Sequence, residues 1–455
     1  MPNSSTETNR NATKAWVVTV EMGLGHLRAA YALRDLAVDG HPLVYGDTGT
    51  ITDPREAGIV RRTRRIYYLF SRMLEWPLIG RLVSALLDAL FKIPDPYPER
   101  DLSKPTFGLR YLNALIRFRG FGASLARRLA ERPRPTIHTF FATAIAQEAF
   151  GNFEQPIFVL ATDSDINRVW VPNDPKRSTL RYLAPCANVV KRLRSYGVPD
   201  ERIILTGFPL PQSCIGSRER LEVLKDDLFN RLLRLDPHDR FFSLHGREVC
   251  HFLGDREIPK QRRDHLTVLF AVGGSGVQAA MARDIIAALA AHLDSGKVRL
   301  FLSAGVNGDV KRQFEHYLDE CGVYRLDGAV RIIHADGYGE YFSLFNAALR
   351  ECDVLWTKPS ELSFYCALGI PIIFSAAVGY HEKINRRWVR EMGAGFKMPG
   401  PARCCDEWLF EMRRKGRLAE AAWNGFLKGR KLGTYAIEEV VATGSFTPGE
   451  PPLGA

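Results

Sequence analysis

The sequence predicts an α/β protein built from two parallel sheets, each covered by helices. A buried strand, a glycine turn and a helix occur in this order at Trp16 and again at Leu266, and strands alternate with helices after both positions. This alternation favours a parallel, doubly wound sheet, because each crossover helix must pack back onto the sheet that its strands form. With 455 residues, the chain is long enough for two domains of ordinary size. We therefore expect two Rossmann-like domains.

The first domain is expected at residues 15–210, after a polar segment at 1–14 that is expected to be disordered. Its first strand, AWVVTVE, is followed by the turn GLGH and by a helix at about 27–37. The other elements expected in this half are a helix at 109–132, a strand ending at 138–140, a helix at 142–150 and a strand at 156–161.

Residues 211–264 are rich in arginine, and we expect them to form a helical insert and a linker. The insert contains His238, His245, Cys250 and His251, whose spacing is not that of a metal site. The second domain is expected at 265–442 and opens with LTVLFAVGGSGVQ. The elements expected after it are strands at 298–305, 330–336, 353–356 and 370–375, and helices at 310–321, 362–368 and up to about 441. The tail at 443–455 has no core-forming pattern and is expected to be disordered.

The composition, 46% hydrophobic and 25% charged, is that of a folded protein. The formal net charge of +11 indicates an anionic partner, which nucleic acid, an acidic membrane or a nucleotide sugar would all satisfy. The eight cysteines contain no C-x-x-C pair, so we expect small core residues in a reducing compartment. The N-terminus lacks an apolar signal region, and no apolar run reaches the ~20 residues of a spanning helix. A cytoplasmic location is therefore expected.

The stretch from Trp356 to Phe396 contains the clearest candidate site. A polar turn at 357–361 separates an apolar strand from a short helix that begins at Ser360. The free N–H groups at a helix start, and the positive end of its dipole, suit a phosphate group. The next loop contains Gly379, His381, Glu382 and Asn385. These side chains would meet a sugar at the same carboxyl edge of the sheet. The alternative is that both segments are the ordinary polar loops of an αβα unit.

This stretch resembles the nucleotide-sugar half of two-domain (GT-B) glycosyltransferases, in particular monogalactosyldiacylglycerol synthases and the lipid-linked N-acetylglucosaminyltransferase of cell-wall synthesis. Those enzymes carry K-x-G-x-x-T-x-x-E-A-L-x-x-G-x-P, then Q-E-x-x-N and G-A-G. The residues that match are Lys358, Gly369, Pro371, Glu382, Asn385 and Gly393-Ala394-Gly395. Phe364 replaces the family glutamate that grips the ribose. Glu361, on the same helix face, is a hypothetical substitute for that glutamate.

The first domain resembles the same enzymes at the turn GLGH. In the family, a G-x-G-H turn followed by two alanines places the histidine in the cleft, facing the acceptor hydroxyl. His26 is thus a candidate general base, because imidazole titrates near neutral pH. The alternative is a turn histidine that caps the helix. Asp163 and Trp170 match a T-D-(x)₆-W element of the galactolipid enzymes, although Asn167 stands where a second histidine is often found.

The resemblance implies transfer of a sugar from a UDP-sugar to a hydroxyl acceptor, expected to be a lipid, by inverting displacement without a metal or cofactor. His26 and Asp163 are the expected catalytic residues. The residues expected to bind the nucleotide sugar are Gly23, Gly25, Gly273, Gly274, Ser275, Gly276, Lys358, Ser360, Glu361, Glu382 and Asn385. Two alternatives stay open: a UDP-sugar epimerase or hydrolase on the same fold, and a catalytically inactive, basic membrane-binding protein.

Residues 61–93 join a basic cluster to apolar, aromatic segments. The cluster consists of Arg61, Arg62, Arg64 and Arg65, and the aromatic residues include Tyr68, Phe70 and Trp76. Interfacial helices have this composition, so we expect this segment to bind an anionic membrane at its inner face. The alternative is a pair of core-facing helices with a solvated basic face. No zinc-finger spacing or RNA-recognition signature is present, so no nucleic-acid partner is expected.

Overall fold

The computed structural model describes residues 14–46, 49–73, 93–95, 97–151, 153–259, 264–273, 276, 278–323, 328–377, 379–449 and 452–453. Several predictions fall outside these residues. They concern the polar segment up to residue 13, Gly274, Ser275, and the aromatic part of the segment 61–93.

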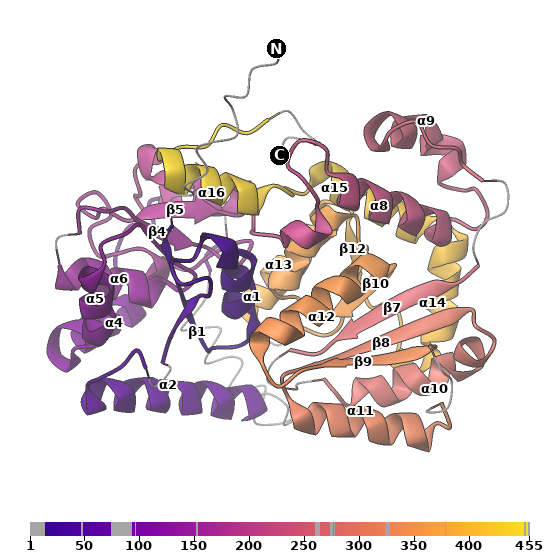
Figure 1. Cartoon of the computed structure of the whole chain (residues 1–455), viewed down its shortest axis with the longest axis horizontal. Helices are drawn as coiled ribbons and strands as arrows, with labels where there is room; N and C mark the ends of the chain where they lie inside the picture. Colours follow the sequence, from indigo (N-terminus) through magenta and orange to yellow (C-terminus); the bar gives the residue numbers. More distant parts are fainter. Residues whose placement is uncertain are drawn as a thin grey trace, which may run out of the picture.

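Two parallel sheets, each six-stranded within the described residues, confirm the predicted two-domain Rossmann-like fold of the GT-B type (Figure 1). The first sheet has the order β2-β1-β3-β4-β5-β6. Its strands are β1 Trp16–Val20, β2 Leu43–Tyr45, β3 Thr136–His138, β4 Ile157–Leu160, β5 Arg181–Ala184 and β6 Ile203–Leu205. Its helices are α1 Leu24–Ala32, α2 Pro54–Met73, α4 Phe107–Arg119, α5 Ala123–Glu131, α6 Phe141–Phe150 and α7 Ala187–Ser195, with short 3₁₀ turns η1 Arg34–Leu36, η2 Arg168–Trp170 and η3 Asp200–Arg202.

The second sheet has the order β12-β11-β10-β7-β8-β9, which is the doubly wound arrangement of a dinucleotide-binding domain. Its strands are β7 Leu266–Ala271, β8 Val298–Gly305, β9 Val330–His334, β10 Val354–Thr357, β11 Ile372–Phe374 and β12 Gly395–Lys397. The helices in this half of the chain are α10 Met281–Asp294, α11 Gly308–Glu320, α12 Tyr338–Glu351, η5 Glu361–Leu368, α13 Tyr380–Glu391, η6 Ala402–Cys404, α14 Cys405–Arg414, α15 Arg417–Lys428 and α16 Gly433–Thr443. The strand β12 was not predicted. Only three of its residues pair with β11, and so short a strand gives no clear pattern in the sequence.

The predicted helix at 109–132 is wrong as a single element. It is divided into α4 and α5 at Gly120 and Gly122, which have left-handed φ values of 70° and 86°. Gly122 also lies so close to α6 that an added Cβ would be 2.4 Å from the Cβ of Ala146. A glycine is therefore needed there both for its backbone conformation and for the approach of the two helices.

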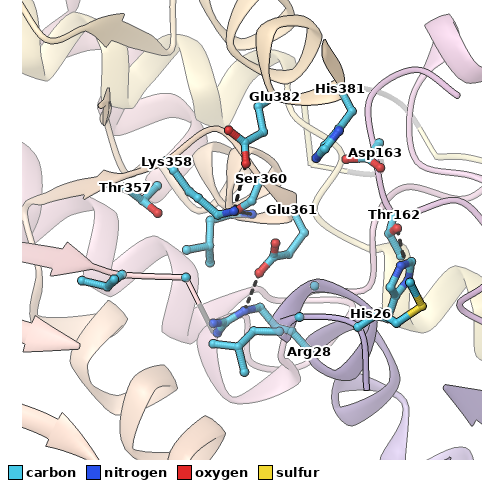
Figure 2. Close-up of a pocket in the computed structure, with 17 residues that line it drawn as sticks. His26, Arg28, Thr162, Asp163, Thr357, Lys358, Ser360, Glu361, His381 and Glu382 are labelled. Atoms are coloured by element: carbon cyan, nitrogen blue, oxygen red, sulfur yellow. Dashed lines mark hydrogen bonds and ion pairs between the residues drawn. The ribbon is translucent and has the colours of Figure 1, made fainter. Parts of the chain in front are cut away.

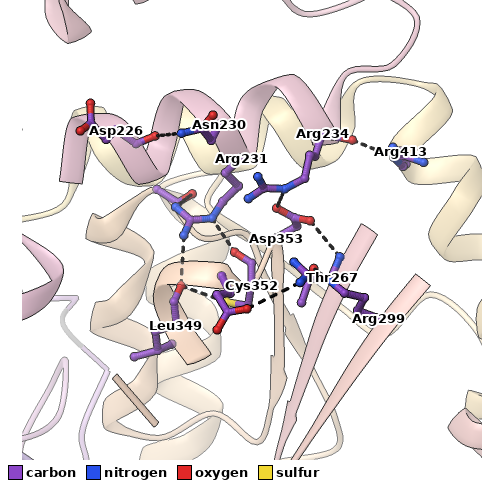
Figure 3. Close-up of polar contacts among 12 residues, drawn as sticks. Asp226, Asn230, Arg231, Arg234, Thr267, Arg299, Leu349, Cys352, Asp353 and Arg413 are labelled. Atoms are coloured by element: carbon purple, nitrogen blue, oxygen red, sulfur yellow. Dashed lines mark hydrogen bonds and ion pairs between the residues drawn. The ribbon is translucent and has the colours of Figure 1, made fainter. Parts of the chain in front are cut away.

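The arginine-rich insert is helical, as predicted, and contains η4 Gln212–Cys214, α8 Glu222–Leu235 and α9 Phe242–Leu253. Buried arginines of α8 tie it to the second sheet (Figure 3). Arg231 donates to the backbone carbonyls of Cys352, Leu368, Gly369 and Leu349, at 2.8 to 3.2 Å. Carbonyls at the end of α12 lack helical partners, so this guanidinium satisfies them. Arg234 pairs with Asp353, which also accepts the N–H of Thr267.

The last helix, α16, packs against the first domain although it follows the second (Figure 1). The hydroxyl of Thr434 donates to the carbonyl of Leu210 at 2.5 Å. Gly433 lies against Phe208, whose carbonyl oxygen would be 2.1 Å from an added Cβ. The C-terminal segment thus joins the two domains at a second place, away from their cleft. All eight cysteines are free. Five of them are buried as expected for core residues, and the three that are only partly buried are Cys250, Cys321 and Cys404.

Candidate functional site

A pocket lies between the two sheets, where the carboxyl ends of β1 and β4 face those of β7 and β10 and the start of α13 (Figure 2). Both sheets reverse their strand order next to these ends, which is where open α/β sheets bind ligands. The lining residues are Met22, Gly23, Leu24, Gly25, His26, Arg28, Thr162, Asp163, Val272, Gly273, Thr357, Lys358, Ser360, Glu361, Leu362, His381 and Glu382.

Most of the site residues predicted from the sequence lie in this lining. Gly276 and Asn385 are absent from it, and Gly274 and Ser275 are outside the described residues. The pocket also contains His381, which the sequence predicted near the sugar, and Arg28, which was not predicted as a site residue. The signal for Arg28 is its position in the apolar helix LGHLRAAYA, where a charged residue with a buried side chain requires a partner.

His26 lies in the first turn of α1, whose N-cap is Gly23, so His26 does not cap the helix. Its Nδ1 is 2.6 Å from the backbone carbonyl oxygen of Thr139. A carbonyl only accepts, so Nδ1 carries the proton and Nε2 keeps its lone pair. The ring of Phe140 packs edge-on against the imidazole at 5.3 Å. These contacts fix both the tautomer and the orientation of the ring.

The charge state of His26 also suits a base. Burial lowers the pKa of His26 below its ordinary value, although Asp163, the Thr139 carbonyl and Glu361 act in the opposite direction. The exposed side chain of His381, which points toward the side of the pocket that holds Asp163, lowers the pKa of His26 further (Figure 2). The imidazole is therefore neutral at pH 7 and able to accept a proton.

Asp163 is held by a contact that crosses between the domains. Its Oδ1 accepts from Nδ2 of Asn385 on α13 at 2.8 Å. The Oδ1 of Asn385 in turn accepts from the backbone N–H and the hydroxyl of Ser164, at 2.9 and 2.7 Å. The Asn385 side chain is fully buried. Asn385 thus contacts the loop after β4. It does not line the pocket, where the resemblance predicted it.

Glu382 and Lys358 form an ion pair of 2.9 Å on the wall of the pocket contributed by the second domain. The prediction that Glu382 and Asn385 lie in a loop is wrong, because α13 begins at Tyr380, directly after its N-cap Gly379. The turn after β7 makes room for this pair, since a Cβ at Gly273 would be 2.7 Å from Cε of Lys358. A side chain at Gly273 would therefore displace the end of the Lys358 side chain.

Ser360 is the N-cap of η5, and its hydroxyl accepts from the N–H of Leu362 at 3.4 Å. The starts of η5 and α1 both border the pocket. The N–H groups at these two helix starts create a positive potential in this part of the cleft.

Glu361 crosses the cleft to pair with Arg28 of α1, at 3.1 Å between Oε1 and Nε. Gly25 provides the space, because a Cβ there would be 3.0 Å from the other carboxylate oxygen. Phe364, which stands at the place of the family glutamate, is buried and stacks on Phe208 at 4.8 Å. Of these two η5 residues, only Glu361 lines the pocket.

In the described part of the chain, no group of three or more His, Cys, Asp and Glu side chains is arranged to hold a metal ion. Among the described helices, none has the length and apolar character needed to cross a bilayer.

Comparison with known proteins gives one family match and several fold-level likenesses. The family model described as Domain of unknown function (DUF6938) matches residues 326–435. No curated protein shows significant sequence similarity. A UDP-GlcNAc 2-epimerase from Neisseria meningitidis, bound to UDP-GlcNAc, is similar with a TM-score of 0.47 and 13% identity, over 94% of this chain and 99% of that one. MurG from Acinetobacter baumannii is similar with a TM-score of 0.43 and 11% identity, over 71% of this chain and 77% of that one. A glycosyltransferase from Rickettsia africae has a TM-score of 0.37 and 12% identity, over 95% of this chain and 100% of that one.

Proposed function

We propose that this protein is a glycosyltransferase that moves a sugar from a UDP-sugar to a hydroxyl acceptor. The proposal rests on one observation above all. His26, oriented by the Thr139 carbonyl with Nε2 unprotonated, lines the same pocket as the Lys358 side chain and the helix start at Ser360. A base on one domain and an anion-binding edge on the other are the two parts that this reaction needs.

The donor would bind mainly to the second domain. The helix starts at Ser360 and Gly23, together with the Lys358 ammonium, offer donors to a diphosphate. Glu382 lies beside Lys358 and would accept hydrogen bonds from sugar hydroxyls. Glu361 would do the same for the ribose, as the hypothetical substitute for the family glutamate.

The reaction would be a single displacement. The acceptor oxygen forms a bond to the anomeric carbon, and the bond from that carbon to the diphosphate oxygen breaks. The proton of the acceptor hydroxyl passes to Nε2 of His26, and UDP leaves with the electron pair of the broken bond. Helix N–H groups and Lys358 stabilise the charge that develops on the leaving group. Attack from the opposite face gives inversion.

We further propose that the acceptor is a lipid, reached at a membrane surface. One described feature supports this. The exposed face of α4 carries three aromatic side chains, Phe107, Tyr111 and Phe118, which are 76%, 59% and 75% exposed. Their spacing places them on one stripe of the helix, and Arg110, Arg117 and Arg119 are exposed beside them. Aromatic groups with arginines are typical of the headgroup boundary of an acidic bilayer.

A second candidate function has a specific observation in its favour. Two histidines and three carboxylates line the pocket, so acid and base groups are present on both sides of it. Such a set could act on a UDP-sugar without an acceptor, as an epimerase or a hydrolase does.

Calorimetric titration with UDP and a panel of UDP-sugars, followed by turnover assays with and without acceptors, separates these functions. The proposal expects UDP binding and acceptor-dependent release of UDP. UDP-sugar turnover in the absence of any acceptor would identify the epimerase or hydrolase. A protein that binds no nucleotide in this pocket would overturn both proposals and leave the inactive membrane-binding protein.

A further inference from the structure

Arg28 carries a guanidinium nitrogen without a hydrogen-bond partner among the residues that the structure describes. The residue is 3% exposed and lines the pocket. Its Nε donates to Glu361, and its Nη2 is 3.4 Å from the hydroxyl of Tyr341. Its Nη1 is buried and has no hydrogen-bond partner among the described residues. A buried, charged donor without an acceptor is costly, so an anion that reaches this nitrogen would be stabilised by it.

The surroundings of Arg28 hold the side chain but do not satisfy Nη1. The guanidinium lies 4.2 Å from the ring centroid of Phe345 and 5.1 Å from that of Phe342. Aromatic faces stabilise the positive charge but accept no strong hydrogen bond. Glu361 engages one edge of the guanidinium through one carboxylate oxygen, whereas an arginine can donate five hydrogen bonds. The packing therefore keeps the positive charge of Arg28 at the pocket, and N–H groups of its guanidinium can still donate to a ligand.

We propose that Arg28 binds the diphosphate of the nucleotide and that Glu361 holds the guanidinium until the diphosphate takes it. This inference rests on the proposed function, since it names a binding residue of the same pocket. Arg28 comes from α1 of the first domain, and Lys358 and Ser360 come from the second. A diphosphate bound by all three would join the two domains.

The guanidinium geometry favours a phosphate over the other parts of a nucleotide. A planar fork of N–H groups matches two phosphate oxygens, and such charge-assisted pairs are stronger than hydrogen bonds to ribose or uracil. When the guanidinium turns from Glu361 to the diphosphate, the carboxylate is released and can accept the ribose hydroxyls. The two binding events then support each other.

If the guanidinium moves from Glu361 to the diphosphate, substitutions of Arg28 and of Glu361 should have opposite effects on anion binding. Arg28→Met removes the cation and keeps much of the side-chain volume, so UDP affinity should fall by about tenfold to a hundredfold. The affinity for uridine, which has no phosphate, should stay within about twofold. Glu361→Gln removes the competing charge. It should strengthen the binding of inorganic pyrophosphate and weaken the binding of uridine.

The test is calorimetric titration of uridine, UMP, UDP and pyrophosphate into the full-length wild-type protein and the variants. Arg34→Met is the matched control, because Arg34 follows the same helix, packs on Tyr31 and has a partly exposed side chain. Arg28→Lys, which keeps the charge, should recover part of the UDP affinity. Melting temperatures show whether each variant is folded.

The outcomes distinguish this inference from the function on which it rests. If the wild-type protein binds none of the four ligands, the proposed function fails. If the wild type binds UDP and a folded Arg28→Met protein binds it equally well, Arg28 is a structural bridge and the inference is overturned. An equal loss of uridine and UDP affinity in Arg28→Met would also overturn it.

Discussion

The Nδ1 atom of His26 lies 2.6 Å from the carbonyl oxygen of Thr139, so the fold determines which nitrogen of this imidazole faces the cleft. We expect His26→Ala to lower kcat by about 10²–10⁴ while UDP binding persists, because only proton transfer is lost. His41→Ala is the control, since His41 is exposed. Near-normal turnover of a folded His26→Ala protein would contradict a role as base.

The pH profile of kcat/KM gives an independent test of His26. The neutral imidazole is the active form, and burial lowers its pKa below the ordinary value of 6.5. The midpoint of the acidic limb should therefore lie below pH 6.5. The acidic limb should disappear in His26→Ala. An acidic limb with its midpoint above pH 6.5 would show that another group controls the rate.

A methyl group at Gly273 is expected to disturb the position of Lys358. A Cβ there would lie 2.7 Å from Cε of Lys358, so Gly273→Ala should displace the end of the lysine side chain and weaken its pair with Glu382. We expect UDP affinity to fall by about tenfold, the usual effect of losing one charge-assisted hydrogen bond. Titration calorimetry measures it. In the control Gly49→Ala, an added Cβ meets nothing within 4 Å. Equal UDP affinity in both variants would remove Lys358 from the donor site.

The Asn385 side chain should contribute to stability and to the position of Asp163. Asn385→Ala leaves the N–H of Ser164 and the Asp163 carboxylate without their partner on α13. We expect a loss of about 1–3 kcal/mol in the free energy of unfolding for each buried group that is left unpaired. Denaturant unfolding measures it, with Asn188→Ala on the exposed surface of α7 as the control. A variant as stable as the wild type would show that water replaces both contacts.

The aromatic stripe of α4 predicts salt-sensitive binding to anionic vesicles. Replacing Phe107, Tyr111 and Phe118 by Ser should weaken vesicle binding at least about tenfold, since each ring contributes apolar burial. The binding should also weaken above ~0.1 M salt, because exposed charges are screened beyond ~10 Å. Leu244→Ser with Leu344→Ser, two other exposed apolar positions, is the control. Vesicle sedimentation gives the readout.

The predicted role of the segment 61–93 is tested in the same assay. Of its arginines, Arg64 pairs with Glu21 at 2.8 Å, whereas Arg61, Arg62 and Arg65 are exposed. Replacing the four by Gln should lower vesicle binding and leave UDP affinity unchanged, with roughly 1 kcal/mol lost for each exposed arginine. Should the wild type ignore acidic vesicles even at low salt, a soluble acceptor would be the better interpretation.

Lys431 predicts a measurable pH dependence of stability. It is fully buried and donates to the carbonyls of Gly429 and Pro452, and burial together with Arg430 lowers its pKa to about 7. Between pH 7 and 10.5 the unfolded lysine holds a proton that the folded one has released. Stability should therefore rise with pH in this window, by up to about 1.4 kcal/mol per pH unit from this group. Lys431→Met should remove that contribution, which denaturant unfolding across the window measures. Identical slopes in the two proteins would contradict the assignment.

The sequence by itself determined the two parallel sheets, the position of each glycine turn and most of the pocket lining. These features depend on local patterns: apolar runs long enough for a buried strand, turns that break them, and helices of ordinary period. It also placed Lys358, Ser360, Glu361 and Glu382 within one segment, so their proximity followed from chain continuity. The division of the helix at 109–132 was missed because the glycine at position 122 is required by its close approach to α6, which no local pattern shows.

Only the tertiary structure decided which of these residues meet across the cleft. Arg28 and Glu361 are 333 residues apart, and Asn385 lies 222 residues from Asp163, yet each pair is in direct contact. Such contacts depend on how two separately folded sheets are placed, which a residue's neighbours in sequence do not specify. The glycines of the two turns also show that neighbours in sequence do not specify contacts across space. A turn pattern predicts that Gly25 and Gly273 are small, but only the opposing side chains, Glu361 and Lys358, show what fills the space that they leave.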